Sequence, residues 1–400
     1  MKTTEIEDDS GGEWKVLAEL LGIDGPVGAS RPNPPEKPPA AKGHVLVMPV
    51  RPHQASESTA EEEPAQAEGA QSETAQEEAA PADKQTLLRR GWAALPEGYR
   101  MPEAAPTVEE AQAWCRHLAE THYENFHVAS WFLPKAFRPH FYSIYAYCRV
   151  SDDLGDEVGD PEVAMALLEA WGEELDACYA GSARHPVFVA LAETIKACSI
   201  PKEPFADLLT AFRQDQTVTR YATMEDVLGY CKYSANPVGR LVLYATGEAE
   251  IDREEKFRLS DKTCTALQLA NFWQDVRDDW SRGRVYIPQK DMEIFHVTEA
   301  TIAEGITTDQ FRGLLRTEVE YARELFEDGL PLIGMVDREL AIDLDLFSRG
   351  GLEILHAIEE REYDVLSERP AIAKSRKAGL AMRAVAAKVL PFLSLGAGRR

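Results

Sequence analysis

The stretch Ala266–Asp279, ALQLANFWQDVRDD, places Gln268, Asn271, Asp275 and Asp279 in an otherwise apolar and aromatic segment. On an α-helix these four positions fall within a stripe less than about 80° wide. Polar groups buried without partners cost roughly 1–3 kcal/mol each. A polar stripe among Leu, Ala, Phe and Trp therefore predicts the polar wall of an internal cavity.

A second acidic motif follows the aromatic run Phe141–Val150. Asp152 and Asp156 are separated by about 40° on a helix and share one face, with Arg149 on the same side. Carboxylates at this spacing repel one another unless a cation lies between them. Two such acidic motifs offer the oxygen ligands that suit Mg²⁺, which is typically shared with substrate phosphates. Together they predict a site for a diphosphate.

The pattern of apolar residues on either side of these motifs predicts helices. Apolar residues recur at spacings of three and four, as in Ala164–Leu168–Trp171–Leu175, and prolines separate segments of helix length. Alternating strand patterns are nearly absent. We predict an all-α protein, with a single domain at residues 96–393 built around a central helix-lined cavity.

Residues 1–95 are predicted to form a disordered, acidic tail rich in Pro, Ala and Glu. Residues 1–84 hold 17 acidic and 7 basic residues, which accounts for −10 of the net charge of −25. Such a composition buries too little apolar surface to offset the entropy of ordering. The apolar segment Trp14–Ile23 has two interpretations, a chance feature of the tail or a short docking motif at helical spacing.

The composition excludes several classes of protein. The net charge of −25 argues against a nucleic-acid partner. The longest stretch without an acid, Lys or Arg is Thr263–Gln274, twelve residues, which is short of the roughly 20 that span a bilayer. The acidic N-terminus lacks the apolar region of a signal peptide, and the six cysteines form no CxxC pair. We therefore expect a cytoplasmic protein.

The motifs together resemble the squalene/phytoene synthase family. The resemblance runs from about Glu124 to Lys377. It rests on Tyr145-x-x-x-Arg149-x-x-Asp152-x-x-x-Asp156, on the Gln268–Asp279 stripe and on Gly283-Arg284-x-Tyr286-x-Pro288. It implies the isoprenoid synthase fold, a prenyl diphosphate lipid as substrate and Mg²⁺ as cofactor.

Within the family, the sequence is most similar to the bacterial hydroxysqualene synthases of hopanoid biosynthesis. The similarity lies in Glu124–Trp131, Phe212–Asp215, Tyr233–Arg240 and Tyr363–Leu366. That resemblance implies an enzyme that ionises presqualene diphosphate and lets water capture the rearranged cation. It also implies other hopanoid-pathway enzymes as partners and peripheral contact with a membrane.

The motifs and the resemblance give a set of expected site residues. The metal ligands are expected to be Asp152, Asp156, Asp275 and Asp279. The substrate-binding residues are expected to be Arg149, Arg213, Gln268, Asn271, Arg284 and Tyr286. The catalytic residues are expected to be Tyr145, Phe126, Asn125 and Asn236, the two asparagines as groups that position the terminating water. Aromatic faces stabilise cations, and the candidates for a cation-stabilising wall are Phe126, Trp131, Phe141, Tyr145, Phe272 and Trp273. For any one of them ordinary core packing is the first explanation, and proximity to the motifs favours Phe126, Tyr145 and Phe272.

Departures from the family pattern bear on the choice of reaction. Condensing members usually carry Ser-Phe where Asn125-Phe126 stands, and a glycine where Ala129 stands. These changes favour an enzyme that starts from presqualene diphosphate. The alternatives are a presqualene diphosphate, squalene or phytoene synthase, or a non-catalytic helical scaffold. The C-terminal segment Val385–Leu395 is either a helix on a membrane surface or a final core helix broken by Pro391.

Overall fold

The computed structural model describes residues 83–121 and 136–389, which belong to one compact unit. Within these ranges there is no β-strand, and the only extended pairing is an isolated bridge between Arg220 and Val285. The prediction of an all-α fold is confirmed. In chain order the elements are α2 (Lys84–Ala94), η1 (Glu97–Tyr99), α3 (Val108–Thr121), α5 (Arg138–Asp156), α6 (Pro161–Tyr179), α7 (Pro186–Cys198), α8 (Glu203–Gln214), α9 (Met224–Ser234), α10 (Asn236–Ala245), α11 (Arg253–Gln274), α12 (Val276–Ser281), α13 (Gln289–Ile294), α14 (Glu299–Glu304), α15 (Asp309–Gly329), η2 (Leu330–Gly334), α16 (Arg338–Glu360) and α17 (Lys374–Val389).

The helix boundaries follow local signals in the sequence. Pro161 and Pro186 occupy first-turn positions of α6 and α7, where a missing N–H has no cost. The Asp160 side chain caps α6 by accepting from the backbone N–H groups of Glu162 and Val163. Thr223 and Asp226 form a reciprocal capping box at the start of α9.

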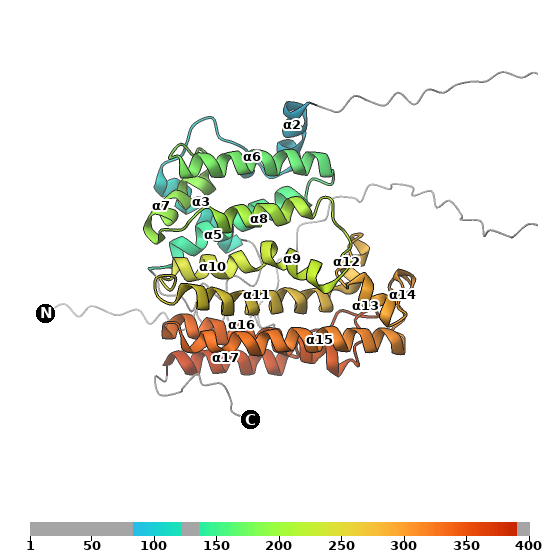
Figure 1. Cartoon of the computed structure of the whole chain (residues 1–400). Helices are drawn as coiled ribbons and strands as arrows, with labels where there is room; N and C mark the ends of the chain where they lie inside the picture. Colours follow the sequence, from blue (N-terminus) through green and yellow to red (C-terminus); the bar gives the residue numbers. More distant parts are fainter. Residues whose placement is uncertain (1–82, 122–135, 390–400) are drawn as a thin grey trace, which may run out of the picture. The chain divides into compact units, whose positions relative to one another are not determined.

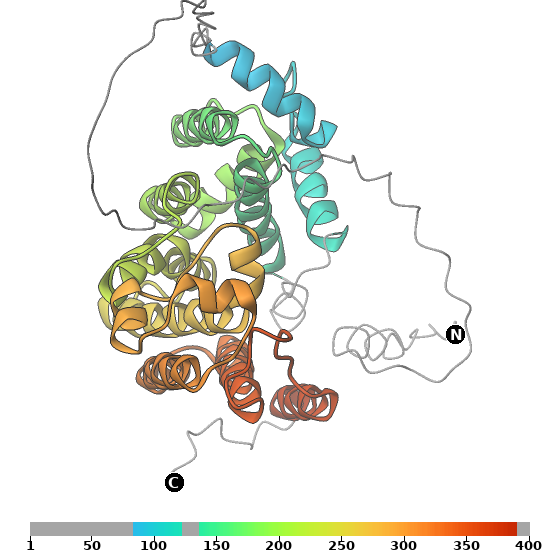
Figure 2. The ribbon, with the colours of Figure 1, turned by 90° about the vertical axis from the view of Figure 1, so that its right-hand side faces the viewer.

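The helices are stacked in layers around α11. Figure 1 shows α6 at one side, α8 and α10 next, α11 in the middle, and α15, α16 and α17 beyond it. Helices that lie lengthwise in Figure 1, among them α6, α11 and α15, are seen end-on in Figure 2, so their axes are roughly parallel. α11 packs against α10, α15 and α16 and buries Leu269, Ala270 and Trp273 among them. This central position makes α11 the floor of the site.

The folded unit begins earlier than the sequence predicts. Helix α2, at Lys84–Ala94, lies within the segment that we expected to be disordered, and it packs against α6 with Gly91 buried. A side-chain carbon at Gly91 would lie 2.9 Å or less from atoms of Leu167 and Val163, so only a glycine allows this close approach. Residues 1–82, including Trp14–Ile23, lie outside the described residues.

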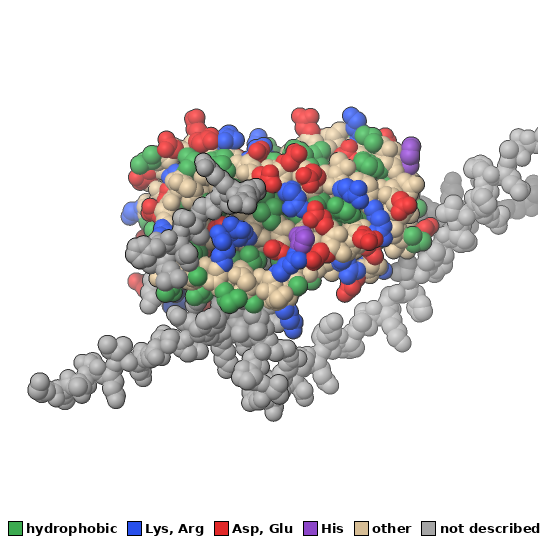
Figure 3. All heavy atoms as spheres, turned by 90° about the horizontal axis from the view of Figure 1, so that it is seen from below, with side chains coloured by type: hydrophobic (Ala, Val, Ile, Leu, Met, Phe, Trp, Pro, Cys, Tyr) green, Lys and Arg blue, Asp and Glu red, His purple; other side chains and the backbone are tan. Residues whose placement is uncertain are grey.

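The last helix packs against the protein core. α17 buries Ala381, Ala384 and Ala387 and packs on α16, while Met382 and Val389 are exposed. For residues up to 389 this agrees with the final-core-helix interpretation; Pro391 lies outside the described residues. Figure 3 shows acidic and basic side chains interspersed over the face that contains α15, α16 and α17. Among the described residues, no helix has the length and apolar character needed to cross a membrane.

Candidate active site

A polar pocket of about 540 Å³ opens between α5, α8, α9 and α11. All four predicted metal ligands line it, as do most of the predicted substrate-binding residues. Its described lining consists of Tyr145, Cys148, Arg149, Asp152 and Asp156 from α5, Leu208, Phe212 and Asp215 from the end of α8, Tyr230 and Ser234 from α9, Val238 from α10, Gln268, Asn271 and Phe272 from α11, and Asp275, Asp279, Arg282, Arg284 and Tyr286. The structure therefore brings together two motifs more than one hundred positions apart in the sequence.

The first acidic motif lies on the last turn of α5, with its arginine held in place. The Arg149 guanidinium forms an ion pair with Asp152 at 3.6 Å and donates from Nε to Asp153 Oδ2 at 3.1 Å. Asp153 is buried, and its Oδ2 also accepts a hydrogen bond of 2.6 Å from the Tyr99 hydroxyl. Tyr99 and Asp153 thus orient Arg149 while Asp152 and Asp156 remain partly exposed at the pocket.

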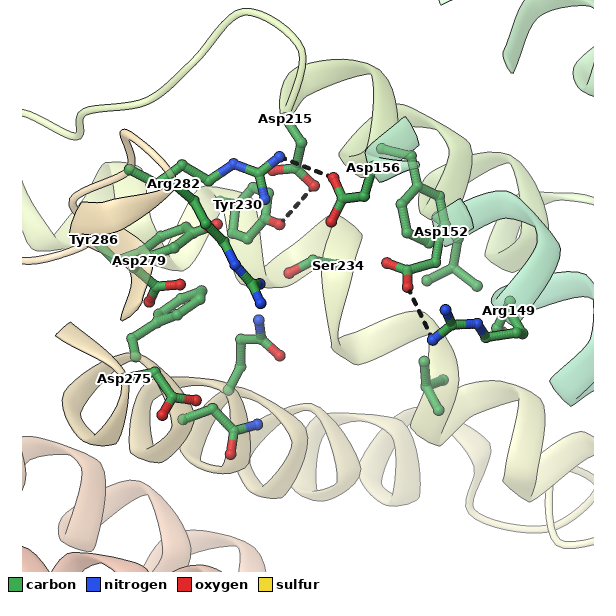
Figure 4. A pocket seen from close by; sticks show the side chains of 18 of the residues that line it. Arg149, Asp152, Asp156, Asp215, Tyr230, Ser234, Asp275, Asp279, Arg282 and Tyr286 are labelled. Carbon is green, nitrogen blue, oxygen red and sulfur yellow. Dashed lines mark hydrogen bonds and ion pairs between the residues drawn. The ribbon is translucent and has the colours of Figure 1, made fainter. Parts of the chain in front are cut away.

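The second acidic motif crosses a break between two helices. α11 ends at Gln274, and Asp275, with φ −106° and ψ 15°, separates it from α12. The sequence predicts a single stripe on one helix, whereas Asp279 lies on α12. All four stripe residues nevertheless line the pocket. In Figure 4 the carboxylates of Asp275 and Asp279 lie on one side of the pocket and those of Asp152 and Asp156 on the other.

An arginine joins the two sides. Arg284 donates from Nη2 to Asp156 Oδ1 at 3.0 Å, although it lies in the loop after α12 and Asp156 ends α5. Tyr286, two residues later, stacks on Phe272 with ring centroids 3.7 Å apart and contacts Tyr230 at 5.8 Å. The loop therefore supplies both a cation and part of an aromatic wall.

Two carboxyl groups in the pocket titrate well above their usual range. Burial, reinforced by the neighbouring Asp275 carboxylate, raises the pKa of Asp279 to about 7. Burial also raises the pKa of Asp215 to about 6, against the opposing effects of Arg284 and the Tyr230 hydroxyl. Tyr230 donates to Asp215 Oδ2 at 3.0 Å, and Asp215 Oδ1 has no hydrogen-bond partner among the described residues. The pocket thus has an excess of negative charge that a bound cation would relieve.

These residues fit a metal that is shared with a ligand. In residues 83–121 and 136–389, no three His, Cys, Asp or Glu side chains come close enough together to hold a metal ion by themselves. Two separate carboxylate pairs can instead each contribute ligands to ions whose remaining ligands are phosphate oxygens and water. The donor set, all carboxylate and amide oxygens, suits Mg²⁺.

Two predicted site residues lie away from the pocket. Arg213 donates from Nη2 to the backbone oxygen of Leu168 at 2.9 Å, so its guanidinium faces α6. Asn236 is buried at the start of α10, where its amide oxygen accepts from the Thr265 hydroxyl at 2.9 Å. Neither side chain lines the pocket. The Arg213 side chain instead connects α8 to α6, and that of Asn236 connects α10 to α11. Asn125, Phe126 and Trp131 lie outside the described residues.

The other predicted aromatic residues divide between the pocket and the core. Tyr145 and Phe272 line the pocket. Trp273 is fully buried in the core, which agrees with the packing interpretation. Phe141 lines a second, mainly apolar cavity of about 300 Å³. Val238 lines both spaces, so the apolar cavity adjoins the polar pocket.

Two further residues of the site carry no assigned role in the sequence interpretation. Asp215 appears there only as part of the Phe212–Asp215 stretch, and its proximity to Tyr230 could have been found only from the packing of α8 on α9. Arg369 donates from Nη2 to Asp275 Oδ2 at 3.0 Å and to Gln274 Oε1 at 2.9 Å. It lies 94 positions from Asp275, and nothing local in the sequence signals the pairing.

Comparison with known proteins agrees with this geometry. Residues 119–376 match the family model described as squalene/phytoene synthase. A phytoene synthase from Arthrospira platensis is 29% identical over 284 residues, covering 68% of this chain and 91% of that protein. A 15-cis-phytoene synthase from Synechocystis sp. is 30% identical over 291 residues, covering 69% and 85%.

Solved structures of squalene and dehydrosqualene synthases are also similar to this chain. The crystal structure of squalene synthase HpnC from Alicyclobacillus acidocaldarius is 44% identical with a TM-score of 0.61, covering 68% of this chain and 99% of that one. A dehydrosqualene synthase in complex with a ligand has a TM-score of 0.63 at 24% identity, covering 70% and 96%, and supports the fold alone. The helical isoprenoid synthase fold expected from the sequence is confirmed.

Proposed function

Because this chain belongs to the squalene/phytoene synthase family of prenyl-diphosphate-processing enzymes, we propose that it converts presqualene diphosphate into hydroxysqualene. In this reaction the carbon–oxygen bond to diphosphate breaks and its electron pair leaves with the diphosphate. The cyclopropylcarbinyl cation rearranges, a water oxygen bonds to it, and the proton of that water passes to the released diphosphate. The proposal places the enzyme in squalene and hopanoid biosynthesis.

One observation carries the proposal: a carboxylate-lined polar pocket adjoins an apolar cavity at Val238. Such a pair of spaces suits an amphiphile with a charged head and a hydrocarbon tail. The acidic residues face one another across the polar pocket (Figure 4), which matches a diphosphate bound through cations.

Asp152, Asp156, Asp275 and Asp279 would hold Mg²⁺ when the diphosphate binds. The metal supplies Lewis-acid stabilisation of the leaving group. Asp275 is paired with Arg369 and Asp156 with Arg284, so each carboxylate would exchange its arginine partner for a metal if one bound.

The arginines and aromatic rings have separate roles. Arg149 and Arg284 bind diphosphate oxygens and stabilise the charge that grows on them as the bond breaks. Tyr145, Phe272 and Tyr286 line the pocket and offer π faces to the cation, worth about 0.5–2 kcal/mol each. Gln268 and Asn271, on α11, line the pocket and would orient the diphosphate. Among the predicted water-positioning groups, Asn125 is retained over Asn236, whose amide oxygen is already engaged by Thr265.

The similarity to solved and curated proteins bears on the choice of reaction. The 44% identity with a protein described as squalene synthase HpnC favours the squalene branch over the phytoene branch. The curated relatives at 29–30% identity are phytoene synthases, so phytoene synthesis from prenyl diphosphates is the second candidate. A non-catalytic scaffold is disfavoured because it has no need of four acidic residues around one pocket.

The substrate and product are lipids, and we propose a cytoplasmic enzyme that contacts a membrane surface to exchange them. The net charge of −25 gives no general attraction to anionic lipids. The contact would therefore depend on local apolar or basic residues, and partner enzymes of the same pathway would meet the protein there.

A product assay distinguishes the candidates. The full chain with Mg²⁺ and without NADPH would be given presqualene diphosphate, farnesyl diphosphate or geranylgeranyl diphosphate in separate reactions, and products would be identified by mass spectrometry. Hydroxysqualene from presqualene diphosphate alone supports the proposal. Presqualene diphosphate or squalene from farnesyl diphosphate would move the protein to the condensing branch, phytoene would support the second candidate, and no turnover of any substrate would favour the scaffold.

A further inference from the structure

The apolar cavity next to the polar pocket contains a carboxyl group that makes no hydrogen bond within the described part of the chain. Asp343, on α16, lines the cavity and is only 3% exposed. Neither of its carboxyl oxygens has a hydrogen-bond partner among the described residues. Two residues later, Asp345 pairs with Arg349 and Arg383, each at 2.9 Å. The contrast on one helix shows that Asp343 is not part of the ion-pair network that holds α16 to α17.

Its surroundings favour the protonated form of Asp343. Burial raises the pKa of its carboxyl to about 8, and Glu339 on the same helix acts in the same direction. Lys388, from α17, opposes this shift without cancelling it. In its protonated form this carboxyl can both donate and accept a hydrogen bond.

Asp343 lies at the end of the cavity away from the acidic pocket. Helices α11 and α16 run in the same direction, so the first turns of α16, which include Asp343, lie beside the first half of α11. At their starts, Glu248 accepts from the Asp337 backbone N–H at 2.6 Å, and the Glu248 carbonyl accepts from Lys256 at 3.2 Å. At the other end, Gln274, the last residue of α11, donates to the carbonyl of Pro370, which follows α16, at 2.6 Å.

The depth of this position follows from the helix rise. On α11, Ser260 and Thr263 line the apolar cavity while Gln268 lines the polar pocket. Eight residues of helix separate Ser260 from Gln268, which places their levels about 12 Å apart. Asp343 shares the apolar cavity with Ser260 and Thr263 and does not reach the polar pocket.

A buried carboxyl group in a cavity with this much space can bind water. A cavity of about 300 Å³ exceeds the space that one water molecule needs, and polar groups on its wall retain ordered water. Asp343, Ser260 and Thr263 supply polar atoms, whereas the remaining described lining is almost entirely apolar. A hydrocarbon chain that stops short of Asp343 leaves such water in place, and a longer chain must displace it without replacing its hydrogen bonds.

We infer that Asp343 determines the length of the prenyl chain that the cavity accepts, by holding water at its far end. This inference rests on the proposed function, in which the cavity takes a hydrocarbon tail. It assigns Asp343 a role in specificity and none in the chemical step.

Binding of unreactive substrate analogues tests the inference without relying on turnover. Farnesyl and geranylgeranyl thiodiphosphates would be titrated by calorimetry, with Mg²⁺, into the full wild-type chain and into Asp343→Leu and Asp343→Asn. Asp343→Leu removes the water-binding group, so its affinity for the longer chain relative to the shorter is expected to rise about tenfold, or about 1.4 kcal/mol. Asp343→Asn keeps a polar group, so its ratio is expected to stay within about twofold of wild type.

Leu340→Met serves as the matched control, since it changes an apolar wall of the same helix at nearly constant volume. If the leucine side chain is too large for the site, Asp343→Val, with a smaller apolar side chain, tests the same change in the affinity ratio. An unchanged ratio in the leucine and valine variants would overturn the inference, and so would an equal rise in Asp343→Asn or Leu340→Met. Failure of both analogues to bind the wild-type chain would overturn the inference, whereas the proposed function is decided separately by turnover of presqualene diphosphate.

Discussion

Arg284 and Asp156 form an ion pair at 3.0 Å across the polar pocket, although 128 positions separate them in the sequence. The pair joins the end of α5 to the loop after α12 and holds the two acidic motifs at a fixed separation. Both residues line the pocket, and the proposed function makes Arg284 a donor to the diphosphate there.

Replacing Arg284 tests its role as that donor. Arg284→Gln is expected to lower kcat by about 10²–10³, because one preorganised donor to the leaving group is lost. Arg284→Lys keeps the positive charge but lacks the planar guanidinium, so its kcat should lie between those of the wild type and Arg284→Gln. Steady-state kinetics with presqualene diphosphate would check this; a kcat within about threefold of wild type for the glutamine variant would remove Arg284 from the mechanism.

The metal assignment predicts that one carboxylate from each motif is indispensable. Asp152→Asn and Asp275→Asn are each expected to lose at least about 10² in kcat/KM, and excess Mg²⁺ should restore little. Asp278→Asn is the matched control, since Asp278 is exposed beside Asp279 and does not line the pocket. Near-wild-type turnover of either pocket variant at saturating Mg²⁺ would show that the metal ligands lie elsewhere.

Tyr99 is predicted to act through Asp153 and Arg149 as a positioning residue. Tyr99→Phe removes the 2.6 Å hydrogen bond to Asp153 and frees Arg149 to move. We expect KM to rise about three- to tenfold, with a smaller change in kcat, from a loss of about 1 kcal/mol.

Tyr147→Phe provides the comparison for that experiment. Its hydroxyl is also buried, but it donates to the Phe205 carbonyl at 2.7 Å, away from the arginine. Both variants should lose similar thermal stability, and only Tyr99→Phe should change KM. Equal kinetic effects in the two variants would mean that Tyr99 has a structural role alone.

Arg369 forms an ion pair with Asp275, so we expect it to compete with a metal for this carboxylate. Arg369→Gln removes this ion pair, so Mg²⁺ with inorganic diphosphate should stabilise the variant at a lower metal concentration than it does the wild type. Thermal shift over a Mg²⁺ series measures this. Arg258→Gln breaks an exposed ion pair with Glu255 at the other end of α11. It should leave unchanged the Mg²⁺ concentration that gives half of the full thermal shift, which is the midpoint of the series. A midpoint that moves to higher Mg²⁺ in Arg369→Gln would indicate that Arg369 assists loading.

The raised pKa of Asp343 predicts a pH-dependent stability. Its folded-state pKa of about 8 exceeds the unfolded value of about 3.9, so the folded protein holds a proton that the unfolded chain has lost between these values. Stability from this group is therefore lost as pH rises from about 4 to 8, by at most about 1.4 kcal/mol per pH unit.

Asp343→Asn lacks this titration. The melting temperature of the variant minus that of the wild type should increase from pH 5 to pH 8 and then level off. Glu339 and Lys388, which face Asp343, are present in both proteins, so their own titration largely cancels in the difference. A difference that stays constant over this range would show that Asp343 is ionised in the folded state.

The sequence was sufficient for the fold class and for most of the polar pocket. Helical periodicity and the spacing of the four aspartates depend on local geometry, which a sequence displays directly. The break at Asp275 was missed because the polar stripe continues across it without a proline or glycine to mark it. Likewise, Lys84–Ala94 looks like part of a polar tail, and only its packing on α6 explains why it is helical.

Residues whose role depends on tertiary contacts could not be predicted. Arg213 lies next to motif residues in the sequence, yet its guanidinium is used to bind the Leu168 carbonyl. Arg369 and Asp215 reach the pocket through loop and helix packing that no local pattern encodes. Asp343 and Asp345 look alike in the sequence and both are buried, and only their contacts distinguish them, since Asp345 pairs with Arg349 and Arg383.

The central claim is that water captures a cation derived from presqualene diphosphate. It is tested most directly by running the Mg²⁺-dependent reaction in water enriched in the heavy oxygen isotope and analysing the product by mass spectrometry. The account predicts a hydroxysqualene whose oxygen is the heavy isotope. A hydrocarbon product, or an alcohol that carries only light oxygen, would contradict it.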